Sequence, residues 1–481
     1  MDVLQLRTAD GAVLAVPAHL DSTTTYVLLE QEAWFEKETE FLRRWLRPGM
    51  TAIDIGASYG VYSLPTARSV APGGRVFAYE PASEPRALLK RSRELNGAGN
   101  LEIIPLALSD GEREGLLVFG DSSESNALGQ AGAGEPVRVT SLDAEDGTRG
   151  WPAPDFVKID AEGEEERIVA GGRAFFARHS PLVMIEVRAG QGVNEQLRSL
   201  FPAMGYRLYR ALAGAPVLVP LSPQEPLDRY ELNLFAAKPD RAAALAQSGF
   251  LVEEIPPWEP REENLGRALA LPRSQAFVQS FAHLFDDGAP LDPEYRKALA
   301  GYAVWRTPEV PLPVRCAALA FAFRTLQSLC STAPSTGRWM TLARVAWDWG
   351  ARRESVAAVA KVLDGMREGG FHLGEPFWPA CPRFDAIAPG EQPGMWFAAA
   401  AAEQFERAAH YSSMFAETAP VLEFLCGQPF ASAEMERRRV LRAARAGQRP
   451  VVPPRLRADA PDHRNAELWR AGKVPGTAQA G

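Results

Sequence analysis

The chain has 481 residues, 46% of them hydrophobic, and a formal net charge of -8 at pH 7. This length exceeds one ordinary core, and the apolar content is sufficient for two or three domains. Because the chain is acidic and has no Lys- or Arg-rich block, the sequence argues against a nucleic-acid partner and against tight docking on anionic membranes.

The chain opens with two short apolar runs. Val3–Leu6 and Val13–Val16 flank Asp10-Gly11, which predicts a β-hairpin. Apolar residues at helical spacing then predict a helix over Glu32–Leu46, which Pro48-Gly49 ends.

From residue 51 the sequence alternates between strand and helix patterns. The expected strands are Thr51–Ile55, Arg75–Tyr79, Leu101–Leu108, Asp155–Ile159 and Leu182–Val187, with shorter runs at Tyr206–Tyr209 and Leu232–Ala236. The expected helices are Val61–Val70, Glu84–Asn96, Glu164–Ala177 and Glu195–Met204. This order is typical of a doubly wound, Rossmann-like α/β fold with parallel strands. The glycine-containing stretch 111–143 interrupts the alternation, and we interpret it as a lid or substrate wall.

The pattern changes after about residue 240. We predict an α/β domain over 1–245, a proline-containing linker over 246–262, an Ala-rich α-helical domain over 263–446 and a disordered tail over 447–481. Residues 339–359 resemble one helix pair of a tetratricopeptide-type repeat, but no second copy is in register, so an ordinary helical bundle is favoured. Four aromatic residues of this half are better explained as core than as a binding face: Trp378, Trp396, Phe397 and Phe405.

The sequence also predicts a cytoplasmic protein. Residues 1–20 lack the charged start and apolar run of a signal peptide, and no uncharged apolar stretch of about 18 residues predicts a membrane span. The four cysteines form no CxxC pair, which excludes the usual zinc spacings and a disulfide framework. We therefore expect buried thiols in a reducing compartment.

A glycine turn and an acidic residue carry the first chemical signal. In Ile53–Gly60 a buried strand ends in a turn with Gly56 and Gly60, where the backbone can approach a ligand and a helix start offers free N–H groups. Glu80, before Pro81, ends the next strand, where an acid accepts hydrogen bonds from ribose hydroxyls. Together these features indicate a cofactor that contains adenosine.

The spacing of the glycines separates two such cofactors. A dinucleotide pyrophosphate requires GxGxxG, whereas this chain has Gly56-x-x-x-Gly60 preceded by Asp54. The charge of Asp54 would repel a pyrophosphate but attract an ammonium group. We therefore favour S-adenosylmethionine (SAM) over NAD.

Residues 11–238 resemble the FkbM family of SAM-dependent methyltransferases, because their motifs follow one another along the chain in the same order as in the family. The most distinctive element is the KIDAEG segment Lys158–Gly163. Ser58 is a departure, because the family usually has Asn there, and we expect a less firmly oriented turn rather than lost binding. The resemblance implies O-methylation of sugars, lipids or polyketide-like hydroxyls. The residues that we assign to the cofactor are Asp54, Gly56, Ala57, Ser58, Gly60, Glu80, Pro81, Ser109 and Asp110.

Three carboxylates are the candidate catalytic residues. Asp160 and Glu162 follow one strand and Glu186 ends the next, so all should lie at the carboxyl edge of the sheet. Methyl transfer needs in-line positioning, and a hydroxyl acceptor must lose a proton. We favour Asp160 as base or hydroxyl anchor, with Glu162 and Glu186 orienting sugar hydroxyls. A helix-capping role is the alternative, a bound Mg²⁺ is a weaker one, and we assign no metal.

Two nearby residues have other interpretations. Lys158 either neutralises these carboxylates or is a buried structural partner, and the sequence leaves both open. His179 falls at the wrong end of the sheet for a catalytic base.

The sequence thus predicts a SAM-dependent O-methyltransferase for a hydroxylated small molecule or glycan. The alternative is a non-catalytic SAM- or glycan-binding protein with a degenerate fold and a helical protein-interaction domain, against which the intact Glu80, Asp160 and Glu162 argue. The helical half is expected to recognise the acceptor, to self-associate or to bind a partner protein.

Overall fold

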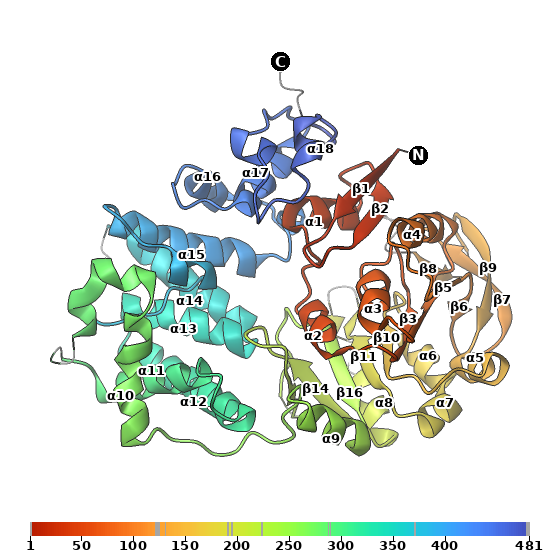
Figure 1. Ribbon diagram of the computed structural model, residues 1–481, viewed down its shortest axis with the longest axis horizontal. Helices are drawn as coiled ribbons and strands as arrows, with labels where there is room; N and C mark the ends of the chain where they lie inside the picture. The colour runs from red at the N-terminus through yellow and green to blue at the C-terminus, as the bar shows by residue number, and fades with distance from the viewer. Residues whose placement is uncertain are drawn as a thin grey trace.

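The computed structural model describes residues 2–120, 126–129, 131–189, 192–193, 196–222, 225–286, 288, 290–369 and 372–477. Figure 1 shows an α/β part, a separate all-helical part beside it, and the C-terminal elements next to the N-terminal hairpin. Among the described residues, no helix is both long and apolar enough to cross a membrane.

An eight-stranded sheet forms the centre of the α/β part, in the order β15-β14-β16-β11-β10-β3-β4-β5. Its strands are β3 (Thr51–Ile55), β4 (Arg75–Tyr79), β5 (Leu101–Ile104), β10 (Phe156–Ile159), β11 (Leu182–Glu186), β14 (Arg207–Ala211), β15 (Leu218–Pro220) and β16 (Asn233–Ala237). The five strands from β5 to β11 are parallel, whereas β16 runs antiparallel to both of its neighbours. The chain winds outward in both directions from the β3–β10 pair, and this switch point is where such sheets bind ligands. The prediction of a doubly wound sheet is confirmed.

Alternate residues of the strands enter two different cores. Ala52, Val76 and Ala78 pack with the N-terminal hairpin and helices on one face. Ile53, Phe77 and their counterparts pack with helices on the other face. The first face is covered by α2 (Glu38–Trp45), α3 (Ser63–Val70), α4 (Ser83–Leu95) and α9 (Pro239–Gln247), and the second by α5 (Leu142–Arg149), α6 (Glu165–Ala170), α7 (Arg173–Arg178) and α8 (Leu197–Ala203). Burial on both faces explains why these strands read as continuous apolar runs.

The predicted strand Leu101–Leu108 is divided between two sheets. Pro105 interrupts it, because proline cannot donate a ladder hydrogen bond. Residues after it start a second sheet with the order β6-β9-β7-β8, made of β6 (Ala107–Leu108), β7 (Arg113–Val118), β8 (Ala127–Gly129) and β9 (Gly134–Thr140). The stretch predicted as a lid or substrate wall therefore contains a small sheet.

The N-terminal hairpin is present as β1 (Val3–Arg7) and β2 (Val13–Pro17), but the helix predicted over Glu32–Leu46 is wrong in its first half. An unpredicted helix, α1 (Thr23–Gln31), ends there with Glu32 in the left-handed conformation, at φ 56°. The Glu32 carboxylate accepts backbone N–H groups of Arg464 (2.9 Å) and Asn465 (3.0 Å). A contact from the far end of the chain thus stabilises a turn that local spacing could not reveal.

The helical part begins after residues 248–261, which contain no helix. It consists mainly of α10 (Glu262–Arg273), η2 (Ala276–Phe285), α11 (Pro293–Trp305), α12 (Leu312–Thr332), α13 (Thr336–Trp349), α14 (Arg352–Arg367), η3 (Pro382–Ala386) and α15 (Pro393–Ala409). Trp378, Trp396 and Phe397 are fully buried in its core, as the core interpretation expected.

The expectation of a disordered tail over 447–481 is wrong for its described residues. After η4 (Ser413–Phe415), α16 (Pro420–Cys426) and α17 (Ala433–Arg445), the chain forms η5 (Pro454–Arg457) and α18 (Ala466–Arg470). Leu456 and Trp469 are buried in the core that contains the N-terminal hairpin. These apolar residues are few and aperiodic, so composition hid them. Residues 478–481 lie outside the described part.

We predict that Trp469→Ala lowers the free energy of unfolding by roughly 3 kcal/mol, because it removes a large side chain that is 1% exposed. Denaturant unfolding followed by fluorescence and circular dichroism measures this. Val451→Ala is the matched control, since Val451 is 70% exposed. Equal stability of the two variants would contradict the packing of the C-terminal segment.

Candidate cofactor and acceptor site

A cavity of about 710 Å³ lies at the carboxyl ends of the central strands and reaches the segment that follows α15. Most of the predicted site residues line it: Asp54, Gly56, Ala57, Ser58, Glu80, Pro81, Asp160, Glu162 and Glu186. Gly60 lies under the turn instead, where a Cβ atom would come 2.5 Å from Leu89 Cδ1. The structure therefore brings the cofactor and catalytic candidates into one space.

Ser109 and Asp110 are the two predicted cofactor residues that do not line the cavity. Ser109 is fully buried and donates a 2.6 Å hydrogen bond to Glu164. Asp110 is exposed and forms a 2.7 Å ion pair with Arg113. The assignment of these two residues to the cofactor therefore stays a prediction, and Ser109 is connected to the cavity through Glu164, which lines it.

The glycine turn is shaped by its approach to the next strand. Gly56 has φ +79°, and a Cβ atom there would lie 1.8 Å from the backbone oxygen of Asp160. The N–H groups of Gly56 and Ala57 both donate to the Tyr79 carbonyl at 3.1 Å. Only glycine fits at position 56, because any side chain would overlap backbone that cannot move away.

Ser58 adopts the left-handed conformation, at φ +47°. Asparagine enters this region more readily than serine, which gives the family's usual residue a physical reason. The backbone N–H of Ser58 donates to Glu80 Oε2 at 2.7 Å, and its buried Oγ has no hydrogen-bond partner in the described structure. The turn is thus tied to Glu80 and leaves one polar atom for a ligand.

Glu80 is held by two backbone donors, Ser58 N at 2.7 Å and Ala82 N at 2.8 Å. Burial raises the pKa of its carboxyl to about 7, although the two N–H groups pull the pKa down. The carboxyl group therefore changes charge near neutral pH.

The strand register places a lysine among the carboxylates. Lys158 on β10 is directly opposite Asp54 on β3. Its Nζ lies 2.8 Å from Asp160 Oδ2 and 4.0 Å from Asp54 Oδ1. Burial alone would lower the pKa of Lys158, but the charges of Asp160 and Asp54 outweigh burial and raise it. Lys158 thus neutralises carboxylates and is also buried, so both open interpretations of this residue hold.

Asp54 keeps one oxygen available. Ser63 Oγ donates to its Oδ2 at 2.5 Å, whereas the buried Oδ1 accepts no hydrogen bond in the described residues. Burial raises the pKa of Asp54, and the Lys158 ammonium acts against this. An unsatisfied buried carboxylate oxygen favours a cationic or hydrogen-bond-donating ligand.

A hydrogen bond links the side chains of Asp160 and Glu186. Burial would raise the pKa of Asp160, but Lys158 and a hydrogen bond from Glu186 lower it. Burial and the charge of Asp160 raise the pKa of Glu186 to about 11. At neutral pH Asp160 is therefore a carboxylate and Glu186 a neutral acid that donates to it.

Several residues that line the cavity were missed by sequence reasoning. Glu36 accepts hydrogen bonds from Tyr62 and, at 2.8 Å, from Asn233. Tyr230, His410 and Tyr411 form another wall. These residues come from connections far apart in the chain. Only the KIDAEG and glycine motifs can be recognised as parts of the site from the local sequence.

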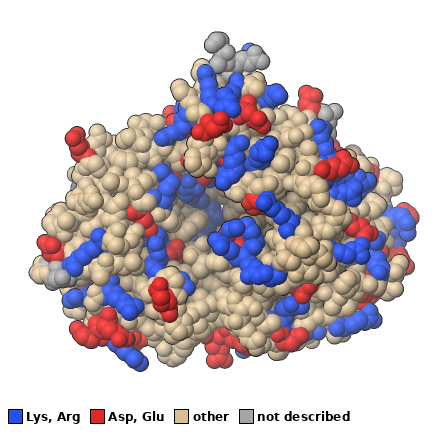
Figure 2. Space-filling model, in the orientation of Figure 1, with Lys and Arg blue, Asp and Glu red and all other residues tan. Residues whose placement is uncertain are grey.

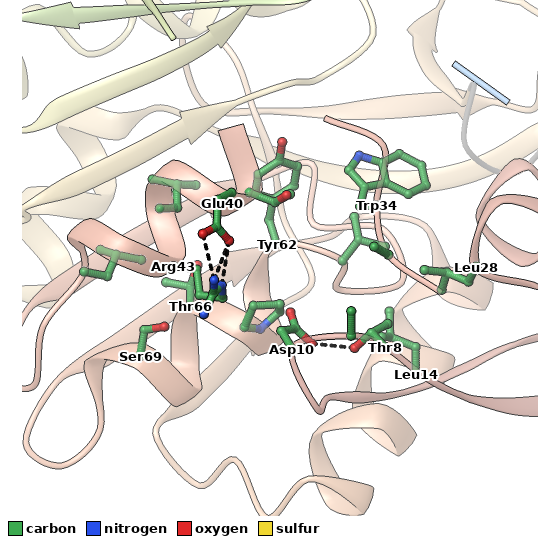
Figure 3. Close-up of a pocket in the computed structure, with 17 residues that line it drawn as sticks. Thr8, Asp10, Leu14, Leu28, Trp34, Glu40, Arg43, Tyr62, Thr66 and Ser69 are labelled. Atoms are coloured by element: carbon green, nitrogen blue, oxygen red, sulfur yellow. Dashed lines mark hydrogen bonds and ion pairs between the residues drawn. The ribbon is translucent and has the colours of Figure 1, made fainter. Parts of the chain in front are cut away.

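A smaller pocket of about 260 Å³ adjoins this cavity, and Trp34, Val61 and Tyr62 line both. Figure 3 shows it between the hairpin, α2 and α3, with the Glu40–Arg43 pair on one side and Thr8 donating to Asp10 on another. Among the described residues, no group of three or more His, Cys, Asp or Glu side chains is placed to hold a metal ion.

Comparison with known families decides the class of this fold. Residues 54–208 match the methyltransferase FkbM domain. This part of the chain is similar to FkbM methyltransferase domains, and we call it the FkbM domain. S-adenosylmethionine is the cofactor of methyltransferases of this class. No curated protein matches the sequence.

Three crystal structures illustrate the similarity of the FkbM domain to solved methyltransferases. Methyltransferase FkbM from Methylobacillus flagellatus KT is 17% identical, with 44% of this chain and 58% of that one covered and a TM-score of 0.28. A SAM-dependent O-methyltransferase from Thermotoga maritima is 16% identical, with 42% and 64% covered and a TM-score of 0.26. The O-methyltransferase from Bacillus cereus in complex with SAH is 14% identical, with 46% and 84% covered and a TM-score of 0.25. The chain thus spans little more than half the length of the first of these proteins.

The residues of the cavity fit S-adenosylmethionine. Asp54 Oδ1 and Ser58 Oγ are buried polar atoms without a hydrogen-bond partner among the described residues, and they suit the ammonium and carboxylate end. Glu80 offers a carboxylate for ribose hydroxyls. Apolar side chains on the adjoining wall suit a flat adenine ring: Leu106, Leu108, Leu117 and Leu128.

We predict that Gly56→Ala reduces SAM affinity by more than about tenfold, because the new Cβ would overlap Asp160 backbone at 1.8 Å. Gly97→Ala is the matched control, since Gly97 also has positive φ, +58°, but nothing within 4 Å. Isothermal titration calorimetry of both variants measures the difference. Equal losses of affinity would contradict the proposed approach of the turn to the ligand.

We also predict that SAM affinity rises with pH through the Glu80 pKa of about 7. Ribose hydroxyls donate to the ionised carboxylate, so binding favours the deprotonated form and weakens as pH falls. Between about pH 8 and pH 6 the affinity should drop up to about tenfold. Calorimetry should give a flat profile for Glu80→Gln. A wild-type profile as flat as that of the variant would remove Glu80 from the ribose site.

Proposed function

We propose that the protein is an O-methyltransferase that transfers the methyl group of SAM to a hydroxyl of a sugar or glycan. The observation that carries this proposal is the single cavity in which Asp54, Ser58 and Glu80 adjoin Asp160 and Glu186. A donor held by the first group would present its reactive end toward the second. When bound, SAM supplies an electrophilic methyl group on a sulfonium centre.

The chain's own contribution is positioning and charge. Asp54 and Glu80 place carboxylates along the cofactor site, and Asp160 adds a negative charge stabilised by Lys158 at 2.8 Å. These fixed charges attract a cationic donor without reorganising during the reaction. Holding donor and acceptor in line supplies most of the rate enhancement in such a displacement.

Asp160 is better suited to anchor the acceptor hydroxyl than to act as a strong base. Its pKa is lowered by Lys158 and by the hydrogen bond from Glu186, so it accepts a hydrogen bond readily but binds a proton weakly. Glu186, whose pKa is raised to about 11 by burial and by Asp160, is neutral and keeps the Asp160 carboxylate oriented. Of the two roles considered for Asp160, the anchor is the one we propose. As the new C–O bond forms and the S–CH3 bond breaks, the proton of the hydroxyl passes to solvent water, and SAH leaves as the other product.

A sugar acceptor is supported by the mixture of groups around the cavity. Glu36, Glu162 and Asp160 provide hydrogen-bonding oxygens, whereas Phe35 and Tyr411 provide aromatic rings whose centroids are 5.1 Å apart. Sugar rings have hydroxyl edges and apolar C–H faces, which these two kinds of side chain complement.

The test is calorimetric titration of SAM into the full chain, with NAD as the competitor, followed by methyl transfer to a panel of hydroxylated glycans. We expect SAM to bind and NAD to fail. Asp160→Asn should retain SAM affinity within about threefold but lower kcat about a hundredfold, because the acceptor anchor is lost. Asp286→Asn, at an exposed position of the helical part, is the control and should leave both unchanged.

Absence of SAM binding by the folded protein would overturn the proposal. SAM binding without transfer to any hydroxylated acceptor would favour the non-catalytic binding protein.

A further inference from the structure

The helical part supplies one wall of the FkbM domain's cavity. Ala409 ends α15, and His410, Tyr411 and Phe415 follow it into the cavity lining. Tyr230, from the connection before β16, lies beside them, with its ring centroid 6.0 Å from that of Tyr411. We call these five residues the helical wall.

Three arginines surround the helical wall. The Arg352 guanidinium lies 4.3 Å from the Tyr411 ring centroid and 4.8 Å from that of Tyr230. Arg229 is exposed, lies 4.7 Å from the Tyr230 ring centroid and donates to the Tyr230 hydroxyl at 2.7 Å. Arg442 donates to the carbonyls of Ser413 and Glu417, both at 3.2 Å. None of the three forms an ion pair with a carboxylate in the part of the chain that the structure describes.

Nearby carboxylates offset part of this positive charge. Glu434, Glu406 and Glu30 lie 3.1, 3.4 and 3.6 Å from Arg438, and Glu434 is also paired with Arg407. These carboxylates outnumber the two arginines, and Glu406 also offsets part of the charge of Arg442. Asp228 accepts the backbone N–H groups of Tyr230 and Arg353, at 3.0 and 2.9 Å, and offsets part of the Arg352 charge.

The end of α15 also offsets part of that charge. Arg352 donates to the carbonyls of Ala408 and Arg407, at 2.7 and 3.1 Å. A helix C-terminus carries about half a negative charge. Arg229, with the remaining charge of Arg352, therefore keeps positive charge beside the Tyr230 and Tyr411 rings of the helical wall.

His410 of the helical wall is subject to the same positive charge. It is half-buried, and it makes no hydrogen bond to any described residue. Burial lowers its pKa, and so do four arginines: Arg438 and Arg442 on α17, Arg352 on α14, and Arg229 in the connection before β16. The imidazole is therefore neutral at pH 7 and stands in a positive field.

The location of this charge is unusual for a protein with net charge -8. Figure 2 shows a hollow near the middle of this face, between the α/β and helical parts, with Lys and Arg side chains around and inside it. The floor of the cavity, in contrast, carries Asp54 and Asp160. A cationic cofactor suits the floor, and a negative group suits the helical wall.

We propose that the methyl acceptor carries a carboxylate or a phosphate besides its hydroxyl, and that the helical wall with Arg229 and His410 binds this anionic group. This inference rests on the proposed methyltransferase function and names its acceptor as an anionic sugar. A hydroxyl held near Asp160 and an anion held at the helical wall would fix the acceptor at two points. The helical part would thereby select the substrate of the FkbM domain.

The test uses the full chain saturated with SAH, so that no turnover occurs. Calorimetry at low salt compares D-glucuronate, glucose 6-phosphate and inorganic phosphate with neutral glucose. We expect the anionic sugars to bind at least about tenfold more tightly than glucose, and the affinity to fall as salt increases. The carboxylate and phosphate arms show which anion the site prefers.

Two variants locate the site. Arg229→Gln should weaken binding of the anionic sugars about tenfold and leave SAH affinity unchanged. Arg324→Gln, which alters an exposed arginine on α12, should change neither. In spectra of histidine-labelled protein, the resonance that His410→Gln removes should titrate at higher pH when phosphate or glucose 6-phosphate is bound, because the anion offsets the surrounding arginines.

Glucose binding as tightly as the anionic sugars, or no binding of any anionic probe to the SAH-loaded protein, would overturn the inference. Anion binding that Arg229→Gln and Arg324→Gln affect equally would also overturn it. Failure of SAH itself to bind the folded chain would instead contradict the proposed function.

Discussion

The ammonium group of Lys158 lies between carboxylates at the carboxyl ends of β3 and β10, and the floor of the cavity depends on it. Without this charge, Asp54 and Asp160 would be buried without a counterion, which is strongly unfavourable. Strand register produces the arrangement, because it aligns Lys158 with Asp54 and Glu186 with Asn233. The strand pairing that builds the sheet therefore also determines which charged side chains lie next to one another in the site.

The segments that follow α15 are joined to α1, in the α/β part, through buried contacts as well as through the chain. The Tyr26 hydroxyl lies 3.0 Å from Ser413 Oγ, and Arg437 donates to the Glu30 carbonyl at 2.7 Å. These bonds fix the segment that carries His410 and Tyr411 against α1. The wall opposite the cofactor residues is thus held by the fold, which is the condition for a preorganised acceptor site.

The sequence was most informative where chemistry and local backbone coincide. Gly56 was recognisable from the glycine turn, Glu80 from its position at the end of a strand, and Asp160 from the KIDAEG motif. Each could therefore be located from its neighbours in the chain. Parallel strands were predictable because burial on both faces leaves uninterrupted apolar runs.

The remaining features depend on contacts between distant segments. Glu32 turns the chain because Arg464 and Asn465 bind its carboxylate. The ordered C-terminal segment depends on a few aperiodic apolar residues such as Trp469, and the Ser109 side chain donates a hydrogen bond to Glu164. Neither the secondary-structure propensity of a residue nor the periodicity of apolar positions reveals such contacts between distant segments. The helical wall escaped prediction for the same reason, since its residues join a loop before β16 to the end of α15.

The central claim is that one cavity holds the methyl donor on the FkbM side and faces the helical wall on the other. A crystal structure of the full chain with SAH bound tests it most directly. We expect the ribose hydroxyls to contact Glu80, the amino-acid end to lie beside Asp54 and Ser58, and open volume to remain between the sulfur atom and Tyr411. SAH bound elsewhere, or helical-wall side chains filling that volume, would contradict the account.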